Sequence, residues 1–325
     1  MQDSFGRKID YLRISVTDKC NLRCQYCMPK EGIRLLEHQE LLQLEEIARV
    51  VRIMADLGIT QIRFTGGEPL VRRNLVKLIM DVHQMEKIQE LSMTTNGVLL
   101  GEQLEQLMNA GLKSVNISLD TMNAATFFQI TGMDAFDKVI RAIEKAVAAG
   151  MKVKINCMPC QEWNAEDVAA VAGLACKYPL DVRFIELMPV GCGREFHGLL
   201  SQKVLGRLED VYGKGVQLEE KRGNGPAIYY DFKGFQGKIG FISPMSHRFC
   251  ASCNRIRLTA EGQLKMCLDY NSGIELKPLL RSGASDEEIK KEILEAVKRK
   301  PKGHDFMNTM QRETLDNRKM VQIGG

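Results

Sequence analysis

Through its first 190 residues the chain alternates short β-branched runs with amphipathic helical segments. Six runs are predicted to be strands: Tyr11–Thr17, Gln61–Thr65, Glu90–Thr95, Ser114–Asp120, Lys152–Met158 and Asp181–Leu187. Three of the helical segments between them, Leu44–Leu57, Glu102–Ala110 and Ala135–Ala149, are each followed by a glycine, which is typical of a helix end. Six strand–helix units in this order predict a parallel sheet, either a barrel or a doubly wound fold.

Polar residues cluster just after the predicted strands. Asp18, the segment 66–69 and Asn96 follow the first three strands, and Ser118 and Glu186 lie at the ends of later ones. In barrels of this kind the active site forms at the carboxyl ends of the strands. Six units in place of eight would leave such a barrel open on one side, so another part of the chain must cover the gap.

The pattern changes after residue 190. Glycine becomes frequent, with short β runs at Ala227–Phe232 and Lys238–Ile242, and a charged helix is predicted at Asp286–Lys300. We therefore expect three regions: an α/β partial barrel at 1–190, a C-terminal region at 191–310, and a polar tail at 311–325 that ends in Gly324 and Gly325.

The composition is that of an ordinary globular protein. Hydrophobic residues make up 44% of the 325 positions, and the formal net charge is +4. This mild charge does not indicate a nucleic-acid or membrane partner. There is no apolar run of membrane-spanning length and no apolar signal segment near Met1, so we expect a cytoplasmic protein. In a reducing compartment, the ten cysteines point to metal or redox chemistry more than to disulfides.

The first cysteine cluster is Cys20, Cys24 and Cys27, with the spacing C-x3-C-x2-C. Three thiolates so close together can hold three corners of a four-iron, four-sulfur cube and leave the fourth iron open. A structural zinc site completed by a distant cysteine is the alternative.

The second cluster is Cys250, Cys253 and Cys267. Its spacing allows an auxiliary iron–sulfur cluster, a four-ligand zinc site that includes His247, or cysteines without a metal. Arg255 and Arg257 follow directly, on one face of a β-like run. Arginine binds phosphate through charge-assisted hydrogen bonds, so this pair suits an anionic substrate.

Two of these motifs carry a resemblance to a known superfamily. The spacing of the first cluster, with Tyr26 before its last cysteine, resembles the signature of radical S-adenosylmethionine (SAM) enzymes, and Gly66-Gly67-Glu68-Pro69 resembles their SAM-binding motif. The resemblance implies that the open iron binds SAM and that a 5′-deoxyadenosyl radical abstracts a hydrogen atom from the substrate. The protein would position these parts while the cofactors carry the chemistry.

Nearly the whole chain is similar to the GTP 3′,8-cyclases of molybdenum cofactor biosynthesis, a radical SAM family. The similarity lies in an ordered set of segments: 12–18, 63–70, 94–97, 116–120, 183–188, 249–258 and the terminal 323–325. It implies that the C3′ hydrogen of the GTP ribose is removed and that C3′ is joined to guanine C8. The product would be (8S)-3′,8-cyclo-7,8-dihydroguanosine 5′-triphosphate, which the synthase MoaC converts to cyclic pyranopterin monophosphate.

The same resemblance assigns the site residues. Cys20, Cys24 and Cys27 would hold the SAM cluster, and Cys250, Cys253 and Cys267 a second [4Fe-4S] cluster whose open iron binds guanine, which leaves His247 without a role. SAM would contact Tyr26, Gly66, Gly67, Glu68, Ser118 and Met188. GTP would contact Arg13, Arg63, Thr94, Lys154, Arg183, Arg255 and Arg257. Residues acting in catalysis would be Arg13, Arg255, Arg257, Gly324 and Gly325, with the tail entering the active site. A reductant for the clusters is required, and the chain would be a homodimer or a monomer.

Several features bear on this interpretation. A triphosphate carries about four negative charges, and the chain has no phosphate-binding G-x4-G-K-[ST] loop, so side chains must neutralise it. Gln61 stands where the family usually has a lysine.

The remaining cysteines have no assigned function. Cys157 and Cys160 are expected to be incidental, Cys176 is expected to lie in the core, and Cys192 has no predicted role. A peptide- or sugar-modifying radical SAM enzyme and a zinc-stabilised binding protein are the competing interpretations.

Overall fold

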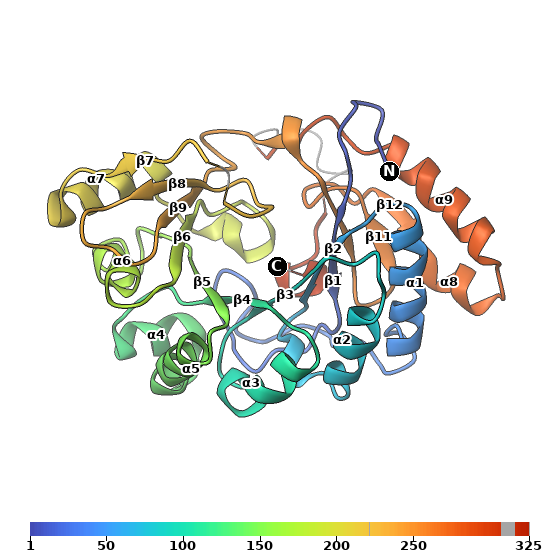
Figure 1. Ribbon diagram of the computed structural model, residues 1–325, viewed down its shortest axis with the longest axis horizontal. Coiled ribbons are helices and arrows are strands. Elements are labelled where there is room, and N and C mark those ends of the chain that lie inside the picture. The colour runs from blue at the N-terminus through green and yellow to red at the C-terminus, as the bar shows by residue number, and fades with distance from the viewer. Residues whose placement is uncertain (221, 307–315, 325) are drawn as a thin grey trace.

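In the computed structural model, residues 1–220, 222–306 and 316–324 are described. Within these residues twelve strands form one curved sheet in the order β12-β11-β10-β1-β2-β3-β4-β5-β6-β9-β8-β7 (Figure 1). The first six are β1 (Tyr11–Ser15), β2 (Gln61–Thr65), β3 (Glu90–Thr95), β4 (Ser114–Ser118), β5 (Lys152–Cys157) and β6 (Asp181–Ile185). The others are β7 (Val216–Gln217), β8 (Ile228–Asp231), β9 (Ile239–Ile242), β10 (Arg255–Leu258), β11 (Gln263–Lys265) and β12 (Gly273–Glu275).

The C-terminal region adds a parallel strand at each edge of the six. β10 pairs with β1 and β9 pairs with β6, both parallel, so eight parallel strands lie side by side. β11 and β12 continue the sheet antiparallel beyond β10, as β8 and β7 do beyond β9. β12 and β7 end the strand order without pairing to each other, so the described chain forms a partial barrel, as predicted.

Helices cover the outer face of this barrel (Figure 1). They are α1 (Leu44–Asp56), α2 (Leu75–His83), α3 (Leu100–Asn109), α4 (Ala124–Thr131), α5 (Phe136–Ala148), α6 (Val168–Lys177), α7 (Ser201–Tyr212), α8 (Leu276–Arg281) and α9 (Asp286–Lys298). A short helix, α10 (Met320–Ile323), lies instead inside the arc of strands, next to the C-terminus. The tail therefore runs into the barrel.

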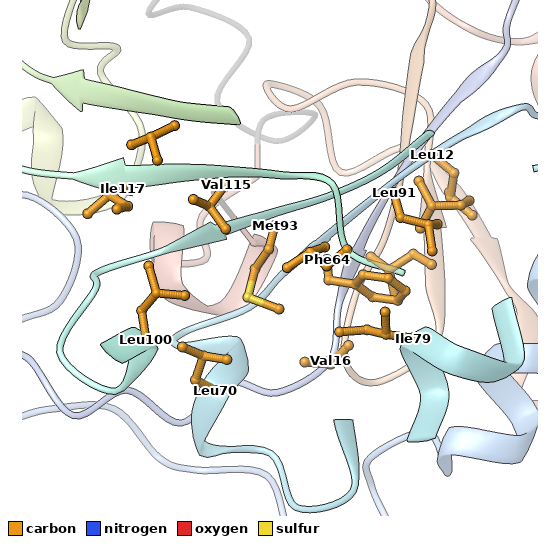
Figure 2. Close-up of a cluster of buried hydrophobic side chains, with 14 of the residues drawn as sticks. Leu12, Val16, Phe64, Leu70, Ile79, Leu91, Met93, Leu100, Val115 and Ile117 are labelled. Atoms are coloured by element: carbon orange, nitrogen blue, oxygen red, sulfur yellow. The ribbon is translucent and has the colours of Figure 1, made fainter. Parts of the chain in front are cut away.

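Strict alternation along the strands separates an apolar outer face from a polar inner face. On β1, Leu12 and Ile14 are fully buried and belong to the core between sheet and helices. Figure 2 shows this core: Phe64, Met93 and Val115 of the next strands lie with Leu70, Ile79 and Leu100 of the covering segments. The residues between these apolar positions face the barrel interior, because successive side chains of a strand point to opposite faces.

Most of the predicted elements are confirmed. All six predicted strands begin at the residue expected, and none ends more than two residues early. The predicted helices α1, α3, α5 and α9 differ by one or two residues at their ends. The prediction that Cys176 lies in the core is wrong: it is in α6 but exposed, because Val171, Ala172 and Ala175 occupy the buried face of that helix. No helix among the described residues is long and apolar enough to cross a membrane.

Candidate active site inside the barrel

The two cysteine clusters lie at opposite ends of the barrel strands. Cys20, Cys24 and Cys27 follow the carboxyl end of β1. Cys250 and Cys253 precede β10, which runs parallel to β1, so they lie at the amino-terminal end, and Cys267 follows the antiparallel β11 back to that end. Between them stands a strand of five residues, about 16 Å long. A small substrate inside the barrel could touch both ends.

The first cysteine cluster consists of three half-buried free thiols. Burial raises the pKa of Cys20, raises that of Cys24 well above its usual range, and raises that of Cys27 to about 12; for Cys24 and Cys27, repulsion from neighbouring thiolates adds to the effect. The three sulfurs are therefore close enough to interact. Thiolates held together in a buried place are unfavourable unless cationic iron neutralises them, so the donor set fits an iron–sulfur cluster.

Gly66 and Gly67 let β2 approach the cysteine loop. A Cβ added at Gly67 would lie 2.3 Å from the Lys19 carbonyl oxygen, and one at Gly66 would lie 2.6 Å from that of Thr17. The Gly67 amide donates to the Thr17 carbonyl at 2.7 Å, and the Glu68 amide to that of Lys19 at 2.8 Å. Only glycine allows this approach, which fixes the loop that carries Cys20.

The Glu68 side chain is buried and accepts hydrogen bonds from Thr95 Oγ1 at 2.8 Å, the Asn96 amide at 2.7 Å and the Leu70 amide at 3.1 Å. Burial nevertheless raises its pKa to about 7. In this arrangement the carboxylate holds the loop after β3 against the cysteine loop. The Asn96 side chain in turn donates to Cys20 Sγ at 3.8 Å.

Tyr26 and Ser118 line one small hollow beside the first cysteine cluster. The Tyr26 hydroxyl donates to Asp120 Oδ2 at 2.7 Å, and the Met158 amide donates to Asp120 Oδ1 at 2.8 Å. Burial raises the pKa of Asp120 to about 6. Met188 follows β6, where its carbonyl packs against Gly193. Of the residues predicted to contact SAM, Tyr26, Gly66, Gly67 and Ser118 thus surround the first cysteine cluster from three strand ends.

The second cysteine cluster is surrounded by basic groups. Lys300 and Arg7 are both buried. The Lys300 ammonium donates to the Arg255 carbonyl at 2.8 Å, and the Arg7 guanidinium donates to the Cys250 carbonyl at 2.9 Å. Although burial opposes it, the charges of Lys300 and Arg255 lower the pKa of Cys253 to about 7. A thiol that ionises near neutral pH is a ready metal ligand.

His247 is exposed, and its ring contacts the neighbouring Ser246 hydroxyl at 3.2 Å. Among the described residues, no three His, Cys, Asp or Glu side chains converge on a point suited to a single metal ion. A four-iron cube takes each thiolate on a different iron, so its ligands need not converge in this way.

A cavity of about 540 Å³ occupies the barrel interior, and five of the seven residues predicted to bind GTP line it: Arg13, Arg63, Lys154, Arg183 and Arg255. Its walls come from β1 to β6, β8, β9, β10 and the segment 222–227, and on β2, β3 and β4 the lining residues lie within the first three positions of each strand. The cavity therefore adds side chains from the amino-terminal part of the strands to the polar residues at their carboxyl ends. The cavity reaches from the middle of the barrel toward the second cysteine cluster.

Strand register sets three arginines side by side. Arg13 of β1 pairs with Arg63 of β2 on one side and with Arg257 of β10 on the other. Like charges in such positions repel. Burial, together with the neighbouring positive charges, lowers the pKa of Arg63 to about 10 and that of Arg257 well below its usual range.

Among the described residues none of the seven predicted GTP-binding side chains forms an ion pair. Four buried polar atoms of the cavity wall also make no hydrogen bond of normal geometry with this part of the chain: Tyr11 Oη, Arg13 Nε, Arg183 Nε and Tyr229 Oη. Buried polar groups are nearly always satisfied. Concentrated positive charge and unsatisfied donors together indicate a site for a polyanionic ligand.

Thr94 and Arg257 do not line the cavity, but they stand close to it. Thr94 pairs in register with Asn116, whose side chain accepts a hydrogen bond from Arg183 at 2.6 Å. The Arg257 guanidinium donates to the carbonyl of Gly324 in the tail. Lys152, Arg222 and Tyr229 also line the cavity and were not predicted. The inward alternation of β5 could have indicated Lys152, whereas no sequence signal pointed to the other two.

The tail inside the barrel packs closely against the strands. Val321 and Ile323 are buried, and a Cβ added at Gly324, where φ is +88°, would lie 2.9 Å from Ser15 Cβ. Hydrogen bonding from the Val321 backbone partly offsets the rise in the pKa of the Cys27 thiol. The tail thus lies between the first cysteine cluster and Arg257. Gly325, also predicted to act in catalysis, falls outside the described residues.

Two family models match most of the chain. Residues 14–175 match the model of the Radical SAM superfamily, and residues 180–306 match that of Molybdenum Cofactor Synthesis C. Among solved structures, Streptococcus suis SuiB bound to S-adenosylmethionine is similar at a TM-score of 0.62 and 16% identity, over 90% of this chain and 68% of that one. This likeness shows the shared fold.

Curated relatives match over the full length. The GTP 3′,8-cyclase of Clostridium perfringens (strain 13 / Type A) is 46% identical over 328 residues, and that of Syntrophomonas wolfei is 46% identical over 331, each covering 100% of both chains. The GTP 3′,8-cyclase of Moorella thermoacetica is 43% identical, again over 100% of both chains. With such identity along its whole length, this chain belongs to the GTP 3′,8-cyclase family of radical SAM enzymes.

Proposed function

We infer that this chain is a radical SAM GTP 3′,8-cyclase that joins ribose C3′ of GTP to guanine C8 in the first step of molybdenum cofactor biosynthesis. The observation that carries this inference is the full-length similarity to GTP 3′,8-cyclases, which covers both cysteine clusters and the arginine-lined cavity between them.

Each cysteine cluster would hold one [4Fe-4S] cluster. Cys20, Cys24 and Cys27 would bind the cluster for SAM, and Cys250, Cys253 and Cys267 the second. When bound, the first cluster and SAM supply the radical that removes a hydrogen atom from the substrate. The position of the two triads at opposite ends of one barrel supports a nucleotide bound with its ribose toward one and its base toward the other.

The residues near the first triad would position SAM. Gly66 and Gly67 keep the backbone close to the cysteine loop, and Tyr26 and Ser118 line the adjoining hollow. Glu68 would act mainly by holding the loop after β3, since its carboxylate already accepts three hydrogen bonds. We propose Met188 as a further SAM contact at the end of β6.

The cavity would bind the nucleotide. Arg63, Lys154 and Arg183 would neutralise the triphosphate, because they are cations of the cavity wall that form no ion pair within the described chain; Arg183 is buried, and the other two are half-buried. Thr94, which stands close to the cavity, would add a hydroxyl that hydrogen-bonds the nucleotide. Arg13, Arg255 and Arg257 lie on the adjacent strands β1 and β10 and would hold the substrate against the second cluster. Through Arg257, the substrate site is joined to Gly324 of the tail, and Gly325 would extend it.

The proposed reaction requires an electron donor and an enzyme that uses its product. A cytoplasmic reductant must supply the electron for SAM cleavage, and the synthase MoaC would consume the cyclised product. We propose that the enzyme works in the cytoplasm as a monomer or homodimer.

Two other functions are less supported. An enzyme that modifies a peptide could share the fold, because SuiB, which was also solved bound to the precursor peptide SuiA, has it, but that likeness has only 16% identity. A zinc-stabilised binding protein does not account for the buried arginines or for the first cysteine cluster.

The test is anaerobic reconstitution followed by incubation with SAM, reductant and GTP deuterated at C3′. We expect 5′-deoxyadenosine to form only with GTP and to carry the deuterium, together with a cyclised GTP product. If 5′-deoxyadenosine forms without deuterium, or equally well without GTP, the proposed reaction is wrong.

A further inference from the structure

A loop at the mouth of the cavity carries an arginine that the sequence did not single out. Residues 222–227 form the last part of the connection from β7 to β8, and all of them line the cavity. The Gly223 backbone approaches Lys154 closely: a Cβ added there would lie 3.2 Å from Lys154 Nζ, at a φ of +75°. The loop therefore reaches Lys154, one of the cations of the cavity wall.

Two acidic residues of the cavity wall hold this loop. The Arg222 guanidinium lies 3.5 Å from Asp181 Oδ1, and the Asn224 side chain donates to Glu90 Oε2. Asp181 and Glu90 are the only carboxylates among the described residues that line the cavity, and both are in contact with the loop. Their printed contacts are with the loop, and among the described residues neither carboxylate forms an ion pair with Arg63, Lys154 or Arg183, although both are near enough to attract these cations.

The Arg222 contact is of a kind that a substrate can replace. The Arg222 side chain is 42% exposed, and its single long contact to Asp181 is at the limit of hydrogen bonding. Asp181 Oδ1 also accepts the Lys238 amide at 3.1 Å, so the carboxylate would keep a partner if Arg222 moved away. Guanidinium binds phosphate with two parallel hydrogen bonds, which is a stronger arrangement than a single long contact.

We propose that Arg222 binds the polyphosphate of the nucleotide, exchanging Asp181 for a phosphate oxygen, and that it makes the site select nucleoside triphosphates over nucleosides. This inference rests on the proposed function. The glycines at positions 223 and 225 give the loop the backbone freedom for that exchange. Arg222 then adds a cation to the cavity at the wall formed by β6 and β8, across from Arg255 on β10.

The test measures binding of GTP and of guanosine to the cluster-reconstituted protein under anaerobic conditions. Arg222→Ala should weaken GTP binding about tenfold to a hundredfold, the loss of one charge-assisted contact, and leave guanosine binding within about twofold. Arg222→Lys should fall between these values, since lysine keeps the charge but not the paired geometry. Asp181→Asn should leave GTP binding unchanged or tighter, because it releases Arg222.

Arg281→Ala is the matched control. Arg281 and its partner Glu46 have side-chain exposures of 37% and 17%, against 42% and 11% for Arg222 and Asp181, and they lie on the outer side of the barrel. This control should bind both ligands as the unmodified protein does. Equal GTP affinity in Arg222→Ala and the unmodified protein, with iron content intact, overturns the role of Arg222. If the unmodified protein binds neither GTP nor guanosine, the proposed function fails instead.

Discussion

The ion pair between Lys265 and Asp316 should control whether the tail stays inside the barrel. The Lys265 side chain, on β11, is 0% exposed, and that of Asp316, the first described residue of the tail, is 2% exposed. Lys265 Nζ also donates to the Tyr270 carbonyl at 2.9 Å, and the Asp316 amide donates to the Asp269 carbonyl at 2.8 Å. Arg318 adds an outer contact to the same carboxylate, at 2.7 Å.

Asp316→Asn keeps the shape of the side chain and removes its charge. Removing one partner of a buried ion pair costs about 3–5 kcal/mol, because the other charge stays desolvated. Here the protein can avoid much of that cost, since undocking of the tail lets water reach Lys265. The equilibrium constant for docking of the tail into the barrel should therefore fall by about 10²- to 10⁴-fold, while the global free energy of unfolding changes little.

Hydrogen exchange read by mass spectrometry on residues 316–324 is the direct assay. In Asp316→Asn the amide of Gly324, which donates to the Met320 carbonyl at 3.0 Å, should lose its protection. GTP cyclisation should fall at least tenfold with the undocked tail, while iron content stays unchanged.

Two further variants make this test specific. Glu261→Gln is the matched control, because Glu261 contacts Arg318 in the same network but its side chain is 36% exposed, and such pairs contribute only about 0–1 kcal/mol. The double variant Lys265→Met/Asp316→Leu should restore docking, because apolar side chains of similar size can replace a buried pair. If Asp316→Asn keeps both full tail protection and full turnover, the pair does not hold the tail and the reasoning is refuted.

Three other outcomes follow from the site. Gly67→Ala should abolish iron retention at the first cysteine cluster, since its Cβ would overlap the Lys19 carbonyl at 2.3 Å; normal iron content would contradict this. Burial and the charges of Arg183 and Arg63 lower the pKa of Lys154 to about 8, and phosphate prefers the protonated amine. GTP affinity should therefore be full below that pKa and about tenfold weaker at pH 9 than at pH 7, whereas Lys154→Gln should bind weakly without this added pH dependence. Cys267→Ser should lower the iron content from about eight to about four per chain, and an unchanged value would remove Cys267 from the ligand set.

Much of this protein could be read from local sequence patterns. The six strands were located at their first residues because alternation of apolar and polar side chains is a local property of each strand. The cysteine triads were found for the same reason, since Cys20, Cys24 and Cys27 lie within eight residues of one another. The resemblance then extended these patterns to substrate and cofactors, and the full-length relatives confirmed the family.

What the sequence left undecided depends on contacts between distant residues. Residue spacing cannot reveal that Arg13 lies beside Arg257, that Arg222 reaches Asp181, or that Lys265 pairs with Asp316. These arrangements exist because β10 pairs with β1 at one edge of the six-stranded sheet and β9 pairs with β6 at the other. The curved sheet then surrounds one interior, with both cysteine clusters and the tail around it. Strand pairing in a barrel is determined by burial of the whole outer face at once. The identity of the chemistry was therefore encoded in short segments, whereas the charge and shape of the cavity that carries it out arise only when the complete sheet has formed.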